Sequence, residues 1–248
     1  MRAIRLHGPA GPKDLLLEEI DVPAVGAGEA PWPTDRLPAI PSYELSGVVA
    51  AVAPDVDQPS VGDEVYGMTP FDRDGVAAEF ARVPASVLAP KPRTLDHVQS
   101  AAIPLPALSA WQGLFDHGGL QAGERLLITG ASGGVGHLAL QLARVRGAEV
   151  ASDGVDLVFD TAGGETLARA TEALRPGGRL VSVAEEPAEG TYYLVEANRT
   201  QLDELARLAD AGELHPEIDS VFPLEEAQAA FERSMARGKR GKVVLRIQ

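Results

Sequence analysis

The stretch LLITGASGGVGHLALQLARVRGAEV, residues Leu126–Val150, joins three kinds of sequence. It opens with an apolar run that predicts a strand, and a turn of small residues follows from Gly130 to Gly136. The Leu- and Ala-rich segment after the turn predicts a helix that runs to about Arg146 and ends at Gly147. Strand, glycine turn and helix in this order are the start of a dinucleotide-binding βαβ unit.

The turn itself has the spacing A-x-G-x-x-G. Gly133 lets the backbone approach a pyrophosphate, and Gly136 lets the helix pack closely on the strand. Free amides at the helix start, together with the helix dipole, attract phosphates. The alternative is a tight turn that binds nothing. The predicted cofactor contacts are Ala131, Ser132, Gly133, Gly134, Val135 and Gly136.

The rest of the chain divides into two kinds of pattern. The first hundred residues hold short β-like runs between Gly and Pro turns, which predict an all-β unit. Later residues alternate strand and helix patterns, and Thr200 is a candidate N-cap. The expected early strands are Arg2–Leu6, Leu15–Ile20, Ser46–Ala53, Val61–Gly67 and Ala77–Val83. The expected later elements are a strand over Asp156–Asp160, a strand over Arg179–Val183, helices over Thr200–Ala211 and Glu225–Arg237, and a closing strand over Lys242–Ile247.

Composition excludes several classes of function. The 248 residues carry a net charge of −14 and a pI of about 4.8, so the chain repels nucleic-acid phosphates and anionic membranes. No apolar run reaches the roughly 20 residues that span a bilayer. The absence of Cys excludes disulfides, thiolate zinc sites and Cys nucleophiles. We therefore expect a cytoplasmic protein with a small-molecule substrate and with neither nucleic acid nor membrane as partner.

Several segments resemble one known family in their combination and order. They are IPLPALSAWQGL at 103–114, AGERLLITGASGGVGHLALQLARVRGAEV at 122–150, GVDLVFDTAGG at 154–164, LRPGGRLVSVA at 174–184 and FPLEEAQAAFERSMARGKRGKVVLRI at 222–247. With these segments the chain resembles the zinc-free quinone oxidoreductase branch of the medium-chain dehydrogenase/reductase superfamily, with internal segments missing.

This resemblance implies an α/β Rossmann cofactor domain combined with a GroES-like β-barrel substrate domain. The substrate domain would comprise residues 1–104, completed by 219–248, and the cofactor domain would comprise 105–218. The implied activity is zinc-independent hydride transfer from NADPH, in preference to NADH, to a quinone or similar conjugated carbonyl, by a homodimer. The alternatives are an enoyl reductase, a zinc-free alcohol dehydrogenase, and a non-catalytic binding or scaffold protein of the same fold.

The residues also argue against a zinc site. Zinc members of the superfamily use Cys, His and Glu ligands, including a Gly-His-Glu run, whereas this chain reads Ser42-Tyr43-Glu44 and has no Cys. Its five His residues are scattered, with no pair at helical ligand spacing. We therefore expect no metal. Hydride addition to a conjugated acceptor needs less electrostatic help than alcohol oxidation does.

Further cofactor contacts are expected outside the turn. The family places a small hydroxyl residue near the cofactor at the position of Ser109, which is otherwise an ordinary helix hydroxyl. Asp160, Thr161 and Ala162 end a parallel strand, where open α/β sheets bind ligands. The other candidates, which end the next strand or match a family position near the cofactor, are Val183, Ala184 and Lys242.

The residue that supplies a proton is left open. Tyr43, Tyr66 and Tyr192 are candidates, and the alternative for each is a half-buried aromatic with no part in the reaction.

Parts of the expected cofactor domain are absent from the sequence. Only a few residues separate Val150 from the strand that begins near Asp156, whereas a parallel crossover needs a dozen or more. Asp153, about 20 residues after Gly133, is therefore expected to lie in a loop rather than at a cofactor-selecting strand end. Similar gaps are expected at 30/31 and near 190/191. We predict chain breaks at 30/31 and 150/151.

Overall fold

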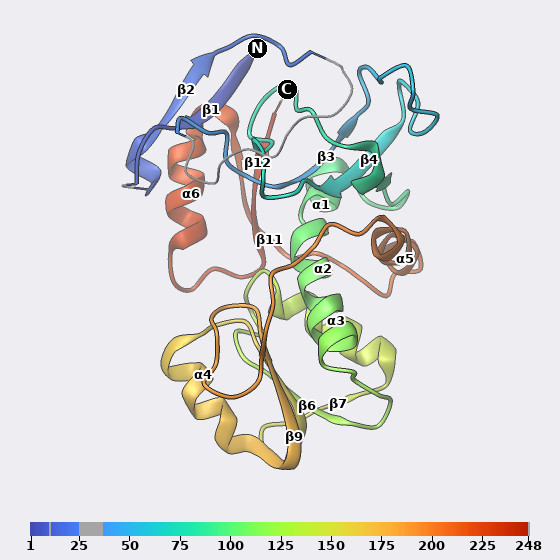
Figure 1. Cartoon of the computed structure of the whole chain (residues 1–248), viewed down its shortest axis with the longest axis vertical. Helices are drawn as coiled ribbons and strands as arrows, with labels where there is room; N and C mark the ends of the chain where they lie inside the picture. The colour runs from blue at the N-terminus through green and yellow to red at the C-terminus, as the bar shows by residue number, and fades with distance from the viewer. Residues whose placement is uncertain (10, 25–36, 248) are drawn as a thin grey trace.

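The computed structural model describes residues 1–9, 11–24 and 37–247, and it divides into the two parts seen in Figure 1. The lower part is an α/β unit built on a five-stranded parallel sheet in the order β10-β9-β8-β6-β7. Its strands are β6 (Arg125–Ile128), β7 (Glu149–Val150), β8 (Val155–Asp160), β9 (Leu174–Ser182) and β10 (Thr191–Tyr192). This sheet confirms the Rossmann-type fold.

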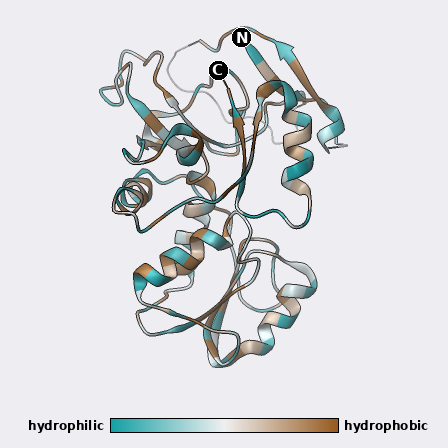
Figure 2. Ribbon diagram, turned by 180° about the vertical axis from the view of Figure 1, so that it is seen from behind, coloured by the Kyte–Doolittle hydropathy of each residue, from teal (hydrophilic) through white to brown (hydrophobic). Residues whose placement is uncertain are grey.

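Burial along β8 explains why helices cover both faces of this sheet. All six residues of β8 are buried, with Leu157 and Phe159 on one face and Val158 on the other. The first face packs against α2 (Pro104–Trp111), the π-helical turn η3 (Gln112–His117) and α3 (Gly136–Arg146). The second packs against α4 (Gly164–Ala170) and the turn η4 (Thr171–Ala173). Figure 2 shows apolar residues running along the central strands between these helices.

The upper part is built from three small sheets. They are β1 (Arg2–Leu6) with β2 (Leu15–Glu19); β3 (Glu44–Val48), β4 (Glu64–Met68) and β5 (Leu88–Pro90); and β11 (Ile218–Pro223) with β12 (Lys242–Arg246). Short helical turns lie at Gly11–Asp14, Ala85–Val87 and Leu224–Glu226. The chain thus returns from the α/β unit to finish among its first strands (Figure 1), as a GroES-like unit does.

The strand expected over Ala77–Val83 is wrong. Ala78 makes only an isolated bridge to Ala3. The reason is that neighbouring amides turn to different partners, since Ala77 donates to Pro41 O at 3.1 Å and Glu79 donates to Arg2 O at 3.0 Å. A regular ladder needs its amides to face one strand. The β11 strand, in turn, was not expected from the sequence, because IDSVFP has no clear alternation.

The remaining helices are α1 (His97–Ala101), α5 (Arg199–Asp210) and α6 (Ala227–Met235). Of these, α5 and α6 are close to the expected ones, and α1 was not expected from the sequence. The N-cap of α5 is Asn198 and not Thr200, because the Asn198 side chain accepts the Gln201 amide at 3.1 Å. Asn at this position satisfies an amide that the helix leaves free.

The chain break predicted at 150/151 stays a prediction, and in the structure residues 151–154 join β7 to β8. Ala151 donates to Leu126 O at 2.9 Å, and β8 begins at Val155. No long crossover is needed, because β7 pairs only with Arg125 and Leu126 at the beginning of β6. Because β7 and β8 lie on opposite sides of β6, residues 151–154 have to span about two strand spacings, or roughly 10 Å.

A similar geometry applies near 190/191, where another gap was expected. β10 pairs with only Val181 and Ser182 at the end of β9. The loop before β10 therefore does not have to return along the whole length of β9. The 30/31 junction lies outside the described residues. Within the described residues, no helix combines the length and the apolar character needed to cross a lipid bilayer.

Candidate functional site

The glycine turn lies where β6 meets α3. Gly133 donates to Gly130 O at 2.8 Å, which closes the turn. A Cβ atom on Gly136 would lie 2.3 Å from Gly130 O and 2.7 Å from the Cα of Ala131. Only glycine fits there, because backbone atoms cannot move aside as a flexible side chain can. A Cβ on Gly133 would approach only Gly130 O, at 3.2 Å, and therefore has space above it.

Free amides line the open side of this turn. Among the described residues, the N–H groups of Ser132, Gly134 and Val135 have no acceptor, and Ser132 is exposed. They precede an eleven-residue helix whose N-terminus carries partial positive charge. Such a group of donors suits a phosphate anion, so the turn fits the pyrophosphate of a dinucleotide.

The start of β12 closes over the same turn. Gly241 donates to Ser132 O at 3.0 Å, and the Lys242 side chain lies against Gly134. The Lys242 ammonium pairs with the Glu44 carboxylate, whose other oxygen accepts the Leu105 amide at 3.0 Å. The two charged side chains are 20% and 14% exposed. Lys242 therefore connects the predicted cofactor turn with β3 of the upper part.

Asp160 holds the carboxyl ends of three strands together. It is 0% exposed, and its carboxylate accepts the Thr129 hydroxyl at 2.5 Å and the Ser182 hydroxyl at 2.8 Å. It also accepts the amides of Ala162 at 3.3 Å and Gly163 at 3.2 Å. Because its oxygens are occupied by these donors, Asp160 shapes the strand ends, and a cofactor contact there would fall to neighbouring groups.

Those neighbours lie close to the turn or to one another. The Thr161 hydroxyl donates to Thr129 O at 2.7 Å and lies beside Gly130. Val183 donates to Asp160 O at 3.1 Å, and Ala184 donates to the Ser182 hydroxyl at 3.2 Å. The structure thus gathers most of the residues predicted to contact the cofactor at one end of the sheet, and their contacts with a cofactor stay predictions.

The Ser109 hydroxyl bonds to the preceding helical turn, and its contact with a cofactor stays a prediction. The hydroxyl donates to Leu105 O at 2.8 Å, one helical turn earlier, and the residue is 1% exposed.

The structure separates the three candidate tyrosines. Tyr66 is fully buried and donates to Leu202 O at 2.5 Å, and burial raises the pKa of its phenol. Tyr192 is 41% exposed on the edge strand β10. Tyr43 is half-buried with its ring edge against Phe71, and burial followed by the charge of Asp74 raises the pKa of its phenol. Of the three, only Tyr43 lines the cavity described next.

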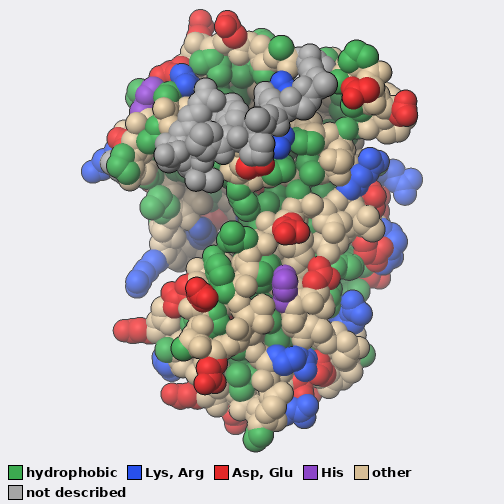
Figure 3. Space-filling model, viewed as in Figure 1, with side chains coloured by type: hydrophobic (Ala, Val, Ile, Leu, Met, Phe, Trp, Pro, Cys, Tyr) green, Lys and Arg blue, Asp and Glu red, His purple; other side chains and the backbone are tan. Residues whose placement is uncertain are grey.

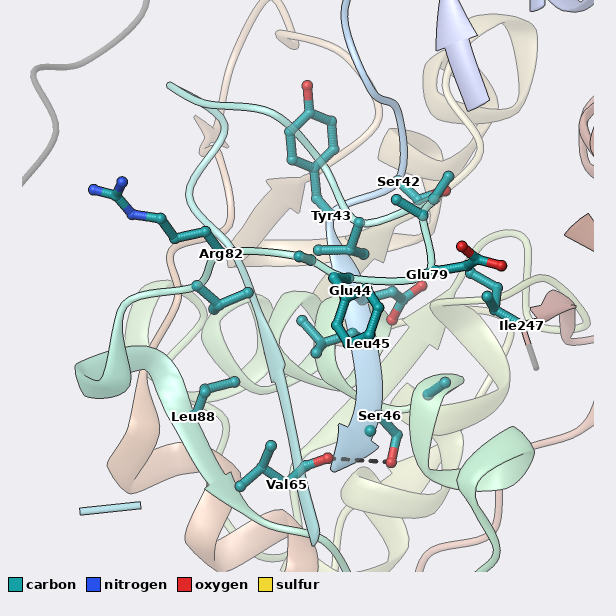
Figure 4. Close-up of a pocket in the computed structure, with 18 of the residues that line it drawn as sticks. Ser42, Tyr43, Glu44, Leu45, Ser46, Val65, Glu79, Arg82, Leu88 and Ile247 are labelled. Carbon is teal, nitrogen blue, oxygen red and sulfur yellow. Dashed lines mark hydrogen bonds between the residues drawn. The ribbon is translucent and has the colours of Figure 1, made fainter. Parts of the chain in front are cut away.

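A cavity of about 1130 Å³ opens inside the upper part. It lies among β3, residues 76–85, α1, α6 and β12, with mostly apolar walls, and Lys242, Glu44 and Leu105 form part of its lining. Figure 4 shows Tyr43 and Glu44 on this wall pointing in different directions. Lys242 therefore borders both the cavity and the glycine turn. The face in Figure 3 also shows apolar side chains gathered at mid-height, between the two parts.

The side of the turn next to β7 lacks the usual ribose-binding strand end. β7 stops level with Leu126, whereas the turn begins at Gly130. Asp153 lies in the connecting loop, as expected, where its carboxylate accepts the Gly154 amide at 2.8 Å. No residue at the end of β7 is therefore placed to bind the ribose of a dinucleotide.

His137, Glu44 and Gly241 were not singled out as site residues from the sequence. His137 is 8% exposed in the first turn of α3, and its ring contacts Gly133 O and the Glu217 amide. Burial lowers the pKa of its imidazole. The Gly-Lys pair at 241–242 was the one local signal for Gly241. Glu217, the second partner of His137, and both partners of Glu44 lie far along the chain.

The comparisons with known proteins agree with this geometry. Two family models match: an alcohol dehydrogenase GroES-like domain over residues 15–93 and a zinc-binding dehydrogenase over residues 140–245. A probable zinc-binding oxidoreductase, mitochondrial, from Arthroderma benhamiae is 31% identical over 291 positions, covering 93% of this chain and 88% of that one. The mouse mitochondrial NAD(P)H oxidoreductase RTN4IP1 is 30% identical, covering 83% of this chain and 70% of its own.

A solved structure shows the same likeness. The quinone oxidoreductase from Coxiella burnetii matches with a TM-score of 0.90 at 25% identity, covering 100% of this chain and 99% of that one. The chain therefore belongs to the medium-chain dehydrogenase/reductase superfamily, and it is an oxidoreductase of that type. The alignment with the Arthroderma benhamiae relative is longer than this whole chain, which confirms that internal segments are missing here.

The donor set does not fit the zinc ion named in two of these descriptions. The chain has no Cys, and Glu44 is engaged by the Lys242 ammonium and the Leu105 amide. In the described ranges, no three His, Asp or Glu side chains group in a way that suits a metal. Three or four converging ligands are the minimum for a zinc site.

We therefore expect the activity to be independent of metal. Dialysis against a chelator should leave the rate unchanged within error, and elemental analysis should find no stoichiometric zinc. Stoichiometric zinc whose removal abolishes activity would contradict this prediction.

Proposed function

We propose that the protein is a zinc-independent oxidoreductase that transfers hydride from NADPH to a quinone or a similar conjugated carbonyl compound. The observation that carries the proposal is the meeting of two features at Lys242: a turn with free amides and a mostly apolar cavity. A dinucleotide held by the turn would have its reactive end directed toward the cavity. The named activities of the relatives support the same class of reaction.

The residues of this chain bind and align, while the cofactor supplies the hydride. The amides of Ser132, Gly134 and Val135 would hold the pyrophosphate, and the apolar walls would exclude water from the acceptor. Tyr43 is the proposed source of the proton that the reduced acceptor takes up. Its phenol is protonated at neutral pH, and it lines the cavity.

NADPH is proposed over NADH because the family resemblance implies it, and the end of β7 holds no residue that would select between the two cofactors. The homodimer implied by the family resemblance stays a prediction.

Cofactor consumption tests the proposal directly. NADPH and NADH are each mixed with the protein and a panel of quinones, enones and aldehydes. Consumption with NADPH and a quinone is expected. Turnover confined to enones would favour an enoyl reductase, and turnover confined to aldehydes would favour an alcohol dehydrogenase.

A non-catalytic scaffold protein is the second candidate, and the short β7 favours it, because a cofactor domain without its ribose-binding segment loses affinity. Calorimetric binding of NADPH separates the two candidates. No binding, together with no consumption, would support the scaffold and overturn the enzyme.

Replacing Lys242 by Met should weaken NADPH binding by about tenfold or more, because the turn loses its nearby cation. Lys239→Met is the matched control, since Lys239 lies in the segment just before β12 but donates to Ser234 O. Titration of both variants checks the result, and equal affinities would contradict a cofactor role for Lys242.

A further inference from the structure

We infer that His137 is a positioning residue for the cofactor: its ring holds the Gly133 carbonyl so that the Gly134 amide faces the pyrophosphate. This inference rests on the proposed function, because it assigns a part in binding the same cofactor. His137 does not touch the reacting atoms, and it acts through the backbone of the turn.

The hydrogen-bond partners define the state of the ring. The Glu217 amide lies 3.0 Å from Nε2 and can only donate, so Nε2 is the unprotonated nitrogen. Nδ1 then carries the proton and donates to Gly133 O at 2.8 Å. Both partners are backbone groups, so a neutral imidazole with a single tautomer is built into the fold.

The Gly133 carbonyl is held twice. The backbone amide of His137 also donates to it, at 3.2 Å. In a trans peptide the C=O and the following N–H point in opposite directions. Fixing Gly133 O toward the helix therefore turns the Gly134 N–H the other way, toward the open side of the turn. That N–H is one of the amides without an acceptor among the described residues.

The other nitrogen of the ring ties the turn to Lys242. Glu217, whose amide donates to His137, accepts the Lys242 amide on its carbonyl at 2.8 Å. The Lys242 side chain in turn lies against Gly134. One imidazole thus sets the positions of a phosphate-binding amide and of the cation beside it.

Gln141, one turn further along α3, makes the same pair of bonds without touching the glycines. Its Nε2 donates to His137 O at 3.0 Å, and its Oε1 accepts the His215 amide at 2.8 Å. A glutamine in this helix can therefore make the same kind of bonds as His137. Gln141 also serves as a control residue, because it lies in the same helix and bonds to the same connecting segment.

The test compares His137→Met, His137→Gln and Gln141→Met with the wild-type protein. NADPH affinity is measured by calorimetry, and KM and kcat are measured with saturating acceptor. We expect His137→Met to raise the Kd and KM for NADPH about tenfold, the effect of a misdirected hydrogen bond to a charged group, with kcat unchanged. His137→Gln should recover most of the affinity, and Gln141→Met should bind as the wild type does.

The outcomes separate two failures. If the wild type binds neither NADPH nor NADH, the proposed function is overturned. If the wild type binds and His137→Met binds equally well, or if Gln141→Met is weakened to the same extent, only the role of His137 is overturned. Nitrogen NMR of labelled histidine in the wild type covers the case in which His137→Met does not fold. A neutral ring protonated at Nδ1 is expected, and protonation at Nε2 overturns the inference.

Discussion

The Gly133→Val protein is expected to fold normally and to lose NADPH binding by at least about a hundredfold. A Cβ at this position would contact only Gly130 O, at 3.2 Å, so the turn needs only a small local shift to admit the side chain. The added methyl groups would occupy space in the turn whose free amides are proposed to hold the pyrophosphate. Calorimetric titration with NADPH, alongside thermal unfolding, checks both parts.

Gly136→Ala is the informative comparison, because it should have the reverse effect. Its Cβ would lie 2.3 Å from Gly130 O, so the strand and helix must separate and stability should fall. The two substitutions in one turn therefore distinguish a glycine needed for the ligand from one needed for packing. Tight NADPH binding by a folded Gly133→Val protein would refute the assignment of the turn.

The second large effect is expected on stability. Asp160→Ala should lower the free energy of unfolding by about 3–5 kcal/mol, because it leaves several buried donors without an acceptor. Those donors are the hydroxyls of Thr129 and Ser182 and the Gly163 amide. Chemical denaturation followed by circular dichroism measures the change.

Asp153→Ala serves as the control for Asp160. Asp153 is exposed and accepts only the neighbouring Gly154 amide, so the expected change is about 0.5 kcal/mol or less. If Asp160→Ala were as mild as this control, Asp160 would not be the residue that holds the strand ends together.

Local sequence patterns were sufficient to predict the elements of the α/β unit. The buried run of β8, the glycine turn and the Gly147 helix stop each depend on residues close together in sequence, and each was predicted correctly. Patterns failed where backbone partners are distant. The 77–83 segment has strand-like composition, but its amides bond to Pro41 and to β1, so no continuous ladder forms.

The missing segments show a second limit. The shortage of residues after Val150 was visible in the sequence, but the way in which the chain accommodates it was not. A two-residue strand paired at the beginning of β6 lets residues 151–154 pass to β8 without a crossover helix. Strand length and register come from packing against the whole sheet, and a crossover rule based on full strands does not apply.

By itself the sequence determined the parallel sheet and the turn with free amides, since these follow from apolar periodicity and from where glycine must stand. The family was indicated by the resemblance of several segments to known proteins. That the glycine turn and the apolar cavity meet at Lys242 depends on tertiary structure. Glu44 and Lys242 are 198 residues apart, and His137 and Glu217 are 80 apart. Neither pair has a sequence signature, because a hydrogen bond or ion pair needs only that the fold bring two groups within about 3 Å of each other.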